Sequence, residues 1–226
     1  SASLPGCPLP DTMDVLARLL DAPQLLALAA ALGWASGIRL YAALFIAGAS
    51  GFLGWVDLPA GLQVLQHPAA LWASGLMVAV EFLADKVPLV DSLWDTAHTV
   101  IRIPAGAALA AAALGAEGPA VAWVAALLGG SLAATAHTAK LATRAAVNTS
   151  PEPFSNMGVS LAEDGFVVFM LWLAFAYPLW FAVALALTLV VAVVLIVVLF
   201  RFLRAVVRRL TDPTAGARPR PRKQDV

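Results

Sequence analysis

The chain has 226 residues, of which 61% are hydrophobic and 12% are charged, and its mean hydropathy is +0.86. A soluble domain has about 45–50% apolar and about 25% charged residues, so these numbers exclude an ordinary soluble domain and indicate a lipid environment. The formal net charge is zero, and the single cysteine, Cys7, excludes an intrachain disulfide and a cysteine metal cluster.

In chain order, we expect a leader, a membrane domain and a tail. The leader, residues 1–23, is Pro-rich and is expected to be disordered or interfacial; it lacks the ordered regions of a secretory signal. Residues 24–210 are predicted to form a six-span transmembrane domain, because a spanning helix needs about 20 mostly apolar residues. The candidate spans are 24–50, 69–84, 89–114, 119–147, 155–177 and 179–203. The second is short, and a re-entrant end is an alternative for it. Residues 211–226 form a basic, Pro-rich tail that is predicted to be disordered.

The distribution of basic residues predicts the orientation of the spans. The links after the first, third and fifth candidate spans contain no Lys or Arg, whereas Lys86 follows the second and Arg144 ends the fourth. Eight Lys and Arg residues follow position 200. Because basic residues gather on the cytoplasmic side, six spans with both termini in the cytoplasm are predicted. We expect the basic segment after the sixth span to bind anionic lipid. No nucleic-acid partner is expected, because no aromatic or folded reader accompanies this segment.

Two polar stripes are predicted on neighbouring helices. The third candidate span carries ionisable residues at i, i+4, i+7 and i+11, on one helix face: Asp91, Asp95, His98 and Arg102. The fourth carries a comparable stripe: His137, Lys140, Arg144 and Asn148. The short Gly-Ala-Glu-Gly-Pro link makes these spans antiparallel neighbours, so the stripes should face each other. A bare charge at mid-bilayer would cost roughly 2.5–3.5 kcal/mol, so mutual neutralisation is the physical reason for the pattern.

Matching depths from the hairpin tip predicts the pairs. Asp91 is expected near Arg144 or Asn148, Asp95 near Lys140 or Arg144, and His98 near His137. Two interpretations of Asp91, Asp95, Lys140 and Arg144 remain open. Either these four charged residues form a functional site, or they lie at the headgroup level and only hold the third and fourth spans together.

Three other candidate spans carry ionisable residues. Arg39 lies about 15 residues into the first, roughly 22 Å deep at 1.5 Å per residue. Glu81 and Asp85 share a face of the second by their i, i+4 spacing, and Glu163 and Asp164 lie two to three turns into the fifth. Intramembrane ionisable residues are functional candidates by default. We expect Arg39 to pair with Glu81 or Asp164.

Several stretches resemble a known family. The run E-F-L-A-D-K-V-P-L-V-D-S-L-W-D from Glu81, the later I-R-I-P-A-G, S-G-I-R-L-Y from Ser36 and S-L-A-E-D-G from Ser160 resemble the bacterial membrane family of domain of unknown function 4126. The resemblance covers about residues 30–200. It implies a multi-pass protein of the bacterial inner membrane and carries no established activity.

The fold expected is therefore an all-α polytopic helical membrane bundle. Three spans precede Gly118 and three follow, and faint similarity between the halves suggests two inverted three-helix repeats, a plan found in secondary transporters.

Three functions remain open. The leading hypothesis is a small permease or channel-like transporter for an ion or small polar solute, with proton coupling as an option. The alternatives are a non-catalytic assembly or accessory subunit and, with less support, a metal-dependent enzyme acting on lipid headgroups. Lys140 and Arg144 opposite the acidic stripe would compete with a metal ion, so no metal site, cofactor or catalytic residue is predicted. Besides lipid and the solute, a second copy of the chain is an open alternative as a partner.

Overall fold

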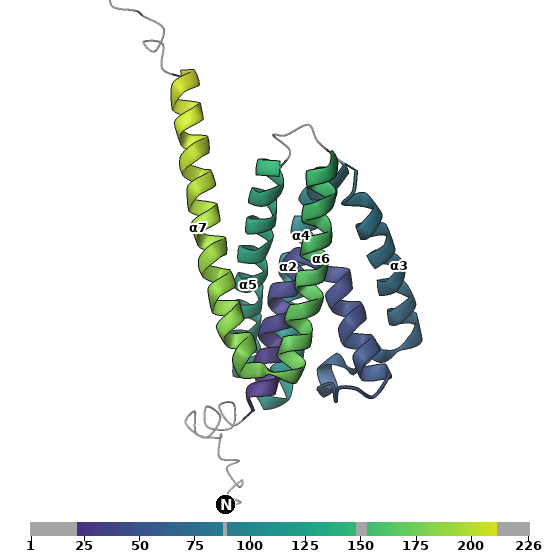
Figure 1. Cartoon of the computed structure of the whole chain (residues 1–226). Helices are drawn as coiled ribbons and strands as arrows, with labels where there is room; N and C mark the ends of the chain where they lie inside the picture. Colours follow the sequence, from purple (N-terminus) through teal and green to yellow (C-terminus); the bar gives the residue numbers. More distant parts are fainter. Residues whose placement is uncertain (1–21, 88–89, 148–152, 212–226) are drawn as a thin grey trace, which may run out of the picture.

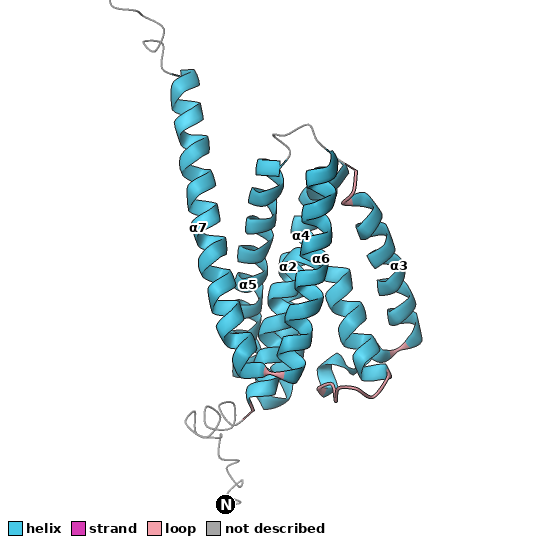
Figure 2. Cartoon of the chain, viewed as in Figure 1, coloured by secondary structure: helices cyan, strands magenta, loops and turns pink. Residues whose placement is uncertain are grey.

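The structure is a computed structural model, and it describes residues 22–87, 90–147 and 153–211. These residues form helices and contain no strand (Figure 2). The elements in chain order are α2 (Pro23–Phe52), η1 (Ala60–Gln66), α3 (Pro68–Ala84), α4 (Val90–Leu114), η2 (Gly115–Glu117), α5 (Pro119–Val147), α6 (Pro153–Ala176) and α7 (Pro178–Thr211). The predicted all-helical membrane bundle is thus confirmed. Nearly all of the leader and tail expected to be disordered lies outside the described residues.

Most of the long helices begin at a proline, which has a preset φ and lacks only an amide hydrogen that the first turn does not use. By length and apolar composition, α2, α4, α5, α6 and α7 could each cross a membrane, and η1 with α3 passes the same test as a pair bent by 70°. All six predicted segments are therefore present as helices.

The helix α2 is broken at Arg39, where φ is −141° and ψ is 75°. Its halves, residues 23–38 and 40–52, would be about 24 Å and about 20 Å long at 1.5 Å per residue, and each is shorter than the hydrocarbon core of about 30 Å. The chain also turns back at the break, because Gln24, near the start of α2, lines the same cavity as Trp55, beyond its end. In place of a straight first span, the chain forms a re-entrant helical hairpin (Figure 1).

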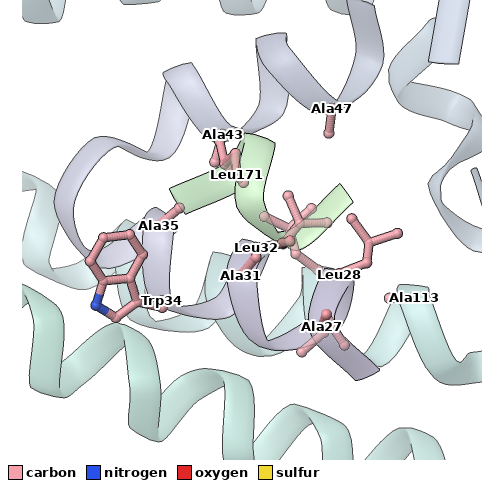
Figure 3. Packing of buried hydrophobic residues seen from close by; sticks show 14 of the residues in the cluster. Ala27, Leu28, Ala31, Leu32, Trp34, Ala35, Ala43, Ala47, Ala113 and Leu171 are labelled. Atoms are coloured by element: carbon pink, nitrogen blue, oxygen red, sulfur yellow. The ribbon is translucent and has the colours of Figure 1, made fainter. Parts of the chain in front are cut away.

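Both halves of α2 contact α6, as expected for a helix that folds back on itself. On the first half, Trp34 packs edge-on against Phe166 with ring centroids 5.4 Å apart. On the second half, Ile46 and Val168 line one cavity. Both halves therefore lie beside the same part of α6. Figure 3 shows side chains of the two halves, among them Leu32 and Ala43, in one hydrophobic core with Leu171 of α6.

The re-entrant hairpin places the start and the end of α2 at the same end of the bundle (Figure 1). The C-terminal ends of α3, α5 and α7 lie at one end of the bundle, which we call the basic end (Figure 1). Lys86 follows α3, Arg144 lies in the last turn of α5, and Arg201 and Arg204 lie in the later part of α7. Pro23 lies at the opposite end, together with η1, η2 and the α6–α7 junction. The prediction of both termini in the cytoplasm treated the first segment as a crossing, and it stays a prediction; in the structure, the start of α2 and the end of α7 lie at opposite ends.

Small residues allow the first half of α2 to approach α4 and α5 closely. A Cβ atom built on Gly33 would lie 2.8 Å from Cα of Gly129, and one built on Gly106 would lie 3.0 Å from the carbonyl oxygen of Gly33. Such contacts between backbones require glycine or alanine, as is common in membrane helix pairs. They hold the broken end of α2 against the polar faces of α4 and α5.

The inverted repeat stays a prediction. The two halves of the chain differ in their first element, because α2 is broken at Arg39 and α5 contains no such break.

Candidate functional site

The polar residues of five helices meet around the break in α2. We call this group the buried ion-pair cluster, and its members are Arg39, Glu81, Asp85, Asp91, Asp95, Arg102, Lys140, Arg144, Glu163 and Asp164. Eight of them are buried, and Glu163 and Asp164 keep 14% and 28% of their side-chain surface exposed. The cluster fills the part of the bundle between the tip of the re-entrant hairpin and the basic end.

Asp85 is at the centre of the cluster. It follows the last residue of α3, and its amide donates to the carbonyl of Glu81, which closes the helix end. Its Oδ2 atom contacts Nη1 of Arg39, and it lies 3.2 Å from Nζ of Lys140 and 3.5 Å from Nη2 of Arg144. One carboxylate oxygen thus faces cations from two helices.

Arg39 is held from α6 as well as from α3. Its Nε atom lies 2.8 Å from Oδ1 of Asp164, and its Nη2 atom lies 3.7 Å from Oε2 of Glu163. Nη2 also donates to Oγ of Ser160 over 3.0 Å. The predicted pair of Arg39 with Asp164 is therefore present, while the other expected partner, Glu81, binds elsewhere.

Arg102 links α4 to α3. Its Nη2 atom donates to Oε1 of Glu81 over 2.5 Å, and its Nη1 atom donates to Oδ1 of Asp95 over 2.8 Å. Lys140 approaches the same Asp95 oxygen at 2.9 Å. All four side chains are almost fully buried, so these groups neutralise one another out of reach of water.

The break in α2 leaves backbone carbonyls at the end of its first half, and side chains of α5 reach them. The carbonyl of Gly37 lies 3.2 Å from Nδ1 of His137, and the carbonyl of Ile38 accepts from Nζ of Lys140 over 3.2 Å. Such carbonyls have no helical partner and carry the negative end of the helix dipole. A lysine at this place satisfies both the hydrogen bonds and the charge of the broken helix.

The pairing of the two stripes follows the prediction for the charged residues. Lys140 contacts Asp95, and Arg144 lies 3.7 Å from Asp91. The expected partner Asn148 lies outside the described residues.

The two histidines contact hydroxyl groups of other residues and do not form the predicted pair. His98 lies 3.2 Å from the hydroxyl of Tyr41 and stacks on Trp94 with centroids 4.1 Å apart. His137 lies 2.7 Å from the hydroxyl of Thr99. The residue after His98, rather than His98 itself, faces α5, which is why the predicted histidine pair does not form.

Four residues of the site were not predicted: Tyr41, Thr99, Asn156 and Ser160. Asn156 accepts from Arg144 over 2.5 Å and donates to the carbonyl of Asp85 over 3.3 Å. Asn156, Ser160 and Glu163 are spaced i, i+4 and i+7 on α6, the same spacing that revealed the stripes on α4 and α5. That pattern was available in the sequence.

The cluster contains more acids than bases. It has six carboxylates and four cations, an excess of two negative charges when all are ionised. Lys86 lies nearby, outside α3, with its Nζ atom 3.0 Å from the centre of the Phe82 ring. Burial lowers the pKa of Lys86 below its ordinary value.

In the described part of the chain, no group of three or more His, Cys, Asp or Glu side chains is arranged to hold a metal ion.

Three cavities reach the cluster or lead toward it. One, of about 210 Å³, lies between α2, α3 and α6 and is lined by Arg39, Glu81 and Asp164. A second, of about 360 Å³, shares Ile46 and Val168 with the first. We call these two cavities the α2–α6 groove.

The third cavity, of about 300 Å³, lies among α2, α5, α6 and α7, and we call it the α5–α7 cavity. Lys140 and Glu163 contribute its charged lining, and the remaining lining is mostly apolar. The cluster is thus approached from two sides of α6.

The comparison with known families agrees with this structure. The model of the family described as "Domain of unknown function (DUF4126)" matches residues 26–198, which include all but the first three residues of the re-entrant hairpin and every member of the cluster. No curated protein and no solved structure gives a significant match to the chain. Because the family model covers most of the sequence, this multi-pass membrane protein belongs to the DUF4126 family.

Proposed function

We propose that the protein is a small membrane transporter that moves an ion or a small polar solute past Arg39 at the tip of its re-entrant hairpin. The observation that carries the proposal is the break in α2, which places Arg39 inside the bundle among carboxylates from α3 and α6. Broken or re-entrant helices at membrane depth occur where the backbone is buried in protein or lines a cavity. In many transporters such breaks form the substrate site.

Charge placement supports a functional site over a purely structural one. Buried ion pairs cost much of what they gain, because two charges must leave water. A bundle that needed only correct helix order would be at least as stable with apolar side chains in these positions. Retaining ten ionisable residues at the meeting point of five helices is the arrangement expected of an ion or substrate pathway.

We further propose that the basic end faces the cytoplasm and that the membrane is the bacterial inner membrane. The described Lys and Arg residues of the links and of the last turns of α7 lie at the basic end, as the positive-inside rule requires. Pro23 then lies on the extracytoplasmic side. Anionic lipid at the basic end would bind Arg201 and Arg204, which are exposed.

Proteoliposome uptake tests the transport proposal. Purified protein would be reconstituted and assayed with a panel of inorganic ions, amino acids and small organic acids, comparing wild type, Arg39→Ala and Asp57→Ala. Asp57 is exposed in the loop after α2 and lies outside the cluster, so it is the control. Transport of at least one solute that is lost in Arg39→Ala and kept in Asp57→Ala is expected. No movement of any solute by folded wild-type protein would contradict the proposal.

One observation favours the second candidate, an assembly or accessory subunit. The α2–α6 groove is lined largely by apolar side chains, including Phe45, Trp172 and Phe175, and a partner helix could occupy it. In that case the cluster only fixes the helix order, and Arg39→Ala would weaken co-purification of a partner without affecting any flux.

A further inference from the structure

Glu163 and Asp164 are consecutive on α6, yet they face different cavities. Asp164 lines the α2–α6 groove, and Glu163 lines the α5–α7 cavity. Successive residues on a helix point about 100° apart, which explains the separation. Arg39 lies between them, 2.8 Å from Asp164 and 3.7 Å from Glu163.

The two cavities differ in how they extend along α6 from this point. Along α6, the α2–α6 groove runs from Asp164 past Val168 and Trp172 to Ala176, where it reaches the loop after α2. The α5–α7 cavity extends about one turn to either side of Glu163 along α6, from Val159 to Phe166. Where Asp164 and Glu163 line them, the cavities are many times larger than the volume of about 10–15 Å³ that admits a water molecule, and the charged side chains there supply the polar partners that water also needs.

The charge balance of the cluster favours the binding of protons by its carboxylates. Two negative charges are in excess among the buried groups, and an unpaired charge is expensive at low dielectric. Oδ1 of Asp85 and Oδ2 of Asp95 are buried and have no hydrogen-bond partner. Side chains with 0% exposure cannot exchange protons directly with water. Glu163 and Asp164 are the members of the cluster with appreciable exposure, so exchange with the cavities takes place through them.

We propose that Glu163 and Asp164 form a proton-exchange pair on either side of Arg39, and that the proton is the ion coupled to transport; this deepens the proposed function and rests on it. A proton arriving through the α2–α6 groove binds the Asp164 carboxylate and removes its charge. Arg39 then loses an ionised partner and moves toward Glu163. A protonated Glu163 facing that guanidinium releases its proton into the α5–α7 cavity. One proton enters and one leaves, so the net charge of the cluster is unchanged, and transfer of the proton from Asp164 to Glu163 restores the starting state.

The surrounding groups fit this exchange. The charged groups that face the pair from the other helices are Arg39 of α2, Glu81 of α3, Asp85 and Lys86 after α3, and Lys140 and Arg144 of α5. From α7, Thr188 and Ala192 complete the wall of the α5–α7 cavity. Glu163 lies 2.9 Å from Nη2 of Arg144 and 4.0 Å from Nζ of Lys140. These cations stabilise its ionised form after the proton has left.

The test is proton flux into proteoliposomes that contain a pH-sensitive dye and are driven by a potassium diffusion potential. Wild type, Asp164→Asn, Glu163→Gln, the double variant and the control Glu117→Gln would be compared after each is shown to be folded and monodisperse. Glu117 lies in η2, at the end opposite the cluster. We expect at least a tenfold loss of proton flux in each single variant and unchanged flux in the control. Because the two carboxylates act in series, the double variant should be no slower than the slower single one. Asp164→Glu should retain flux.

The outcomes separate this inference from the proposed function. Solute uptake without proton movement, unaffected by a pH gradient, would overturn proton coupling and leave the transporter intact. Proton flux that persists in Asp164→Asn and Glu163→Gln would also overturn the inference. If neither protons nor any solute moves with folded wild type, both proposals are wrong. A second readout needs no transport: infrared spectra in detergent should show a protonated carboxyl band at neutral pH that is lost in Glu163→Gln, and an identical band in that variant would count against the pair.

Discussion

Asp85 and Arg39 form a buried ion pair between the end of α3 and the break in α2, although 46 positions separate them in the sequence. The same Asp85 oxygen faces Lys140 and Arg144. Asp85 therefore connects the re-entrant hairpin to α5 as well as to α3. The stability of the bundle and the position of Arg39 should both depend on this carboxylate.

Replacing Asp85 by Asn should destabilise the protein strongly. The change leaves three cations facing a neutral amide, and breaking a buried ion pair from one side costs about 3–5 kcal/mol. Thermal unfolding in detergent, followed by circular dichroism, would measure the loss. Asp57→Asn is the control, since Asp57 is exposed in the loop after α2, and it should unfold at the wild-type temperature. Equal unfolding temperatures for the two variants would mean that Asp85 does not hold the cluster together.

The pair of Arg102 with Glu81 should show energetic coupling. The two side chains lie 2.5 Å apart with at most 2% exposure, so removing one partner leaves the other buried and unpaired. Arg102→Gln and Glu81→Gln should each be strongly destabilising, while the double variant should cost less than their sum by about 1 kcal/mol or more. Chemical or thermal unfolding of all four proteins gives this coupling energy. Strictly additive losses would show that the two residues stabilise the bundle independently.

The helices pack so closely at Gly33 that a larger residue there should destabilise the protein. A Cβ atom there would lie 2.8 Å from the backbone of Gly129, and overpacking costs typically about 1–3 kcal/mol. Gly33→Ala should therefore lower the unfolding temperature. The matched control is Gly165→Ala, because a Cβ on Gly165 has no neighbour within 4 Å; this change should be neutral or raise stability by about 0.4–1 kcal/mol. The reverse order of stability would contradict the packing of α2 on α5.

Much of the fold and part of the site could be predicted from the sequence. Apolar length indicated the helices, and the i, i+4, i+7 spacing on α4 and α5 predicted which faces carry the charges. The short link between these helices fixed their register, so the pairs Asp95 with Lys140 and Asp91 with Arg144 followed.

The break at Arg39 could not be predicted by the same reasoning. The stretch Ile38-Arg39-Leu40 contains neither proline nor glycine, and the Ser36-Gly37 pair before it is a weak signal, because small residues also occur in continuous membrane helices. What stabilises the break is distant in sequence: Lys140 at the carbonyl of Ile38, 102 positions away, and Ser160 at the guanidinium, 121 positions away. The position of the first helix relative to the membrane depends on these contacts, and hydropathy does not contain them.

The most direct test of the account asks whether α2 turns back at Arg39. In a Cys7→Ser background, single cysteines at Gln24, Asp57 and Val87 would be labelled with a membrane-impermeant maleimide in intact and in permeabilised cells or vesicles. All three positions are exposed, with Gln24 and Asp57 at one end of the bundle and Val87 at the basic end. We expect Gln24 and Asp57 to be labelled from the same side and Val87 from the other. Labelling of Gln24 and Asp57 from opposite sides would mean that α2 crosses the bilayer, and it would contradict the re-entrant hairpin together with the functions built on it.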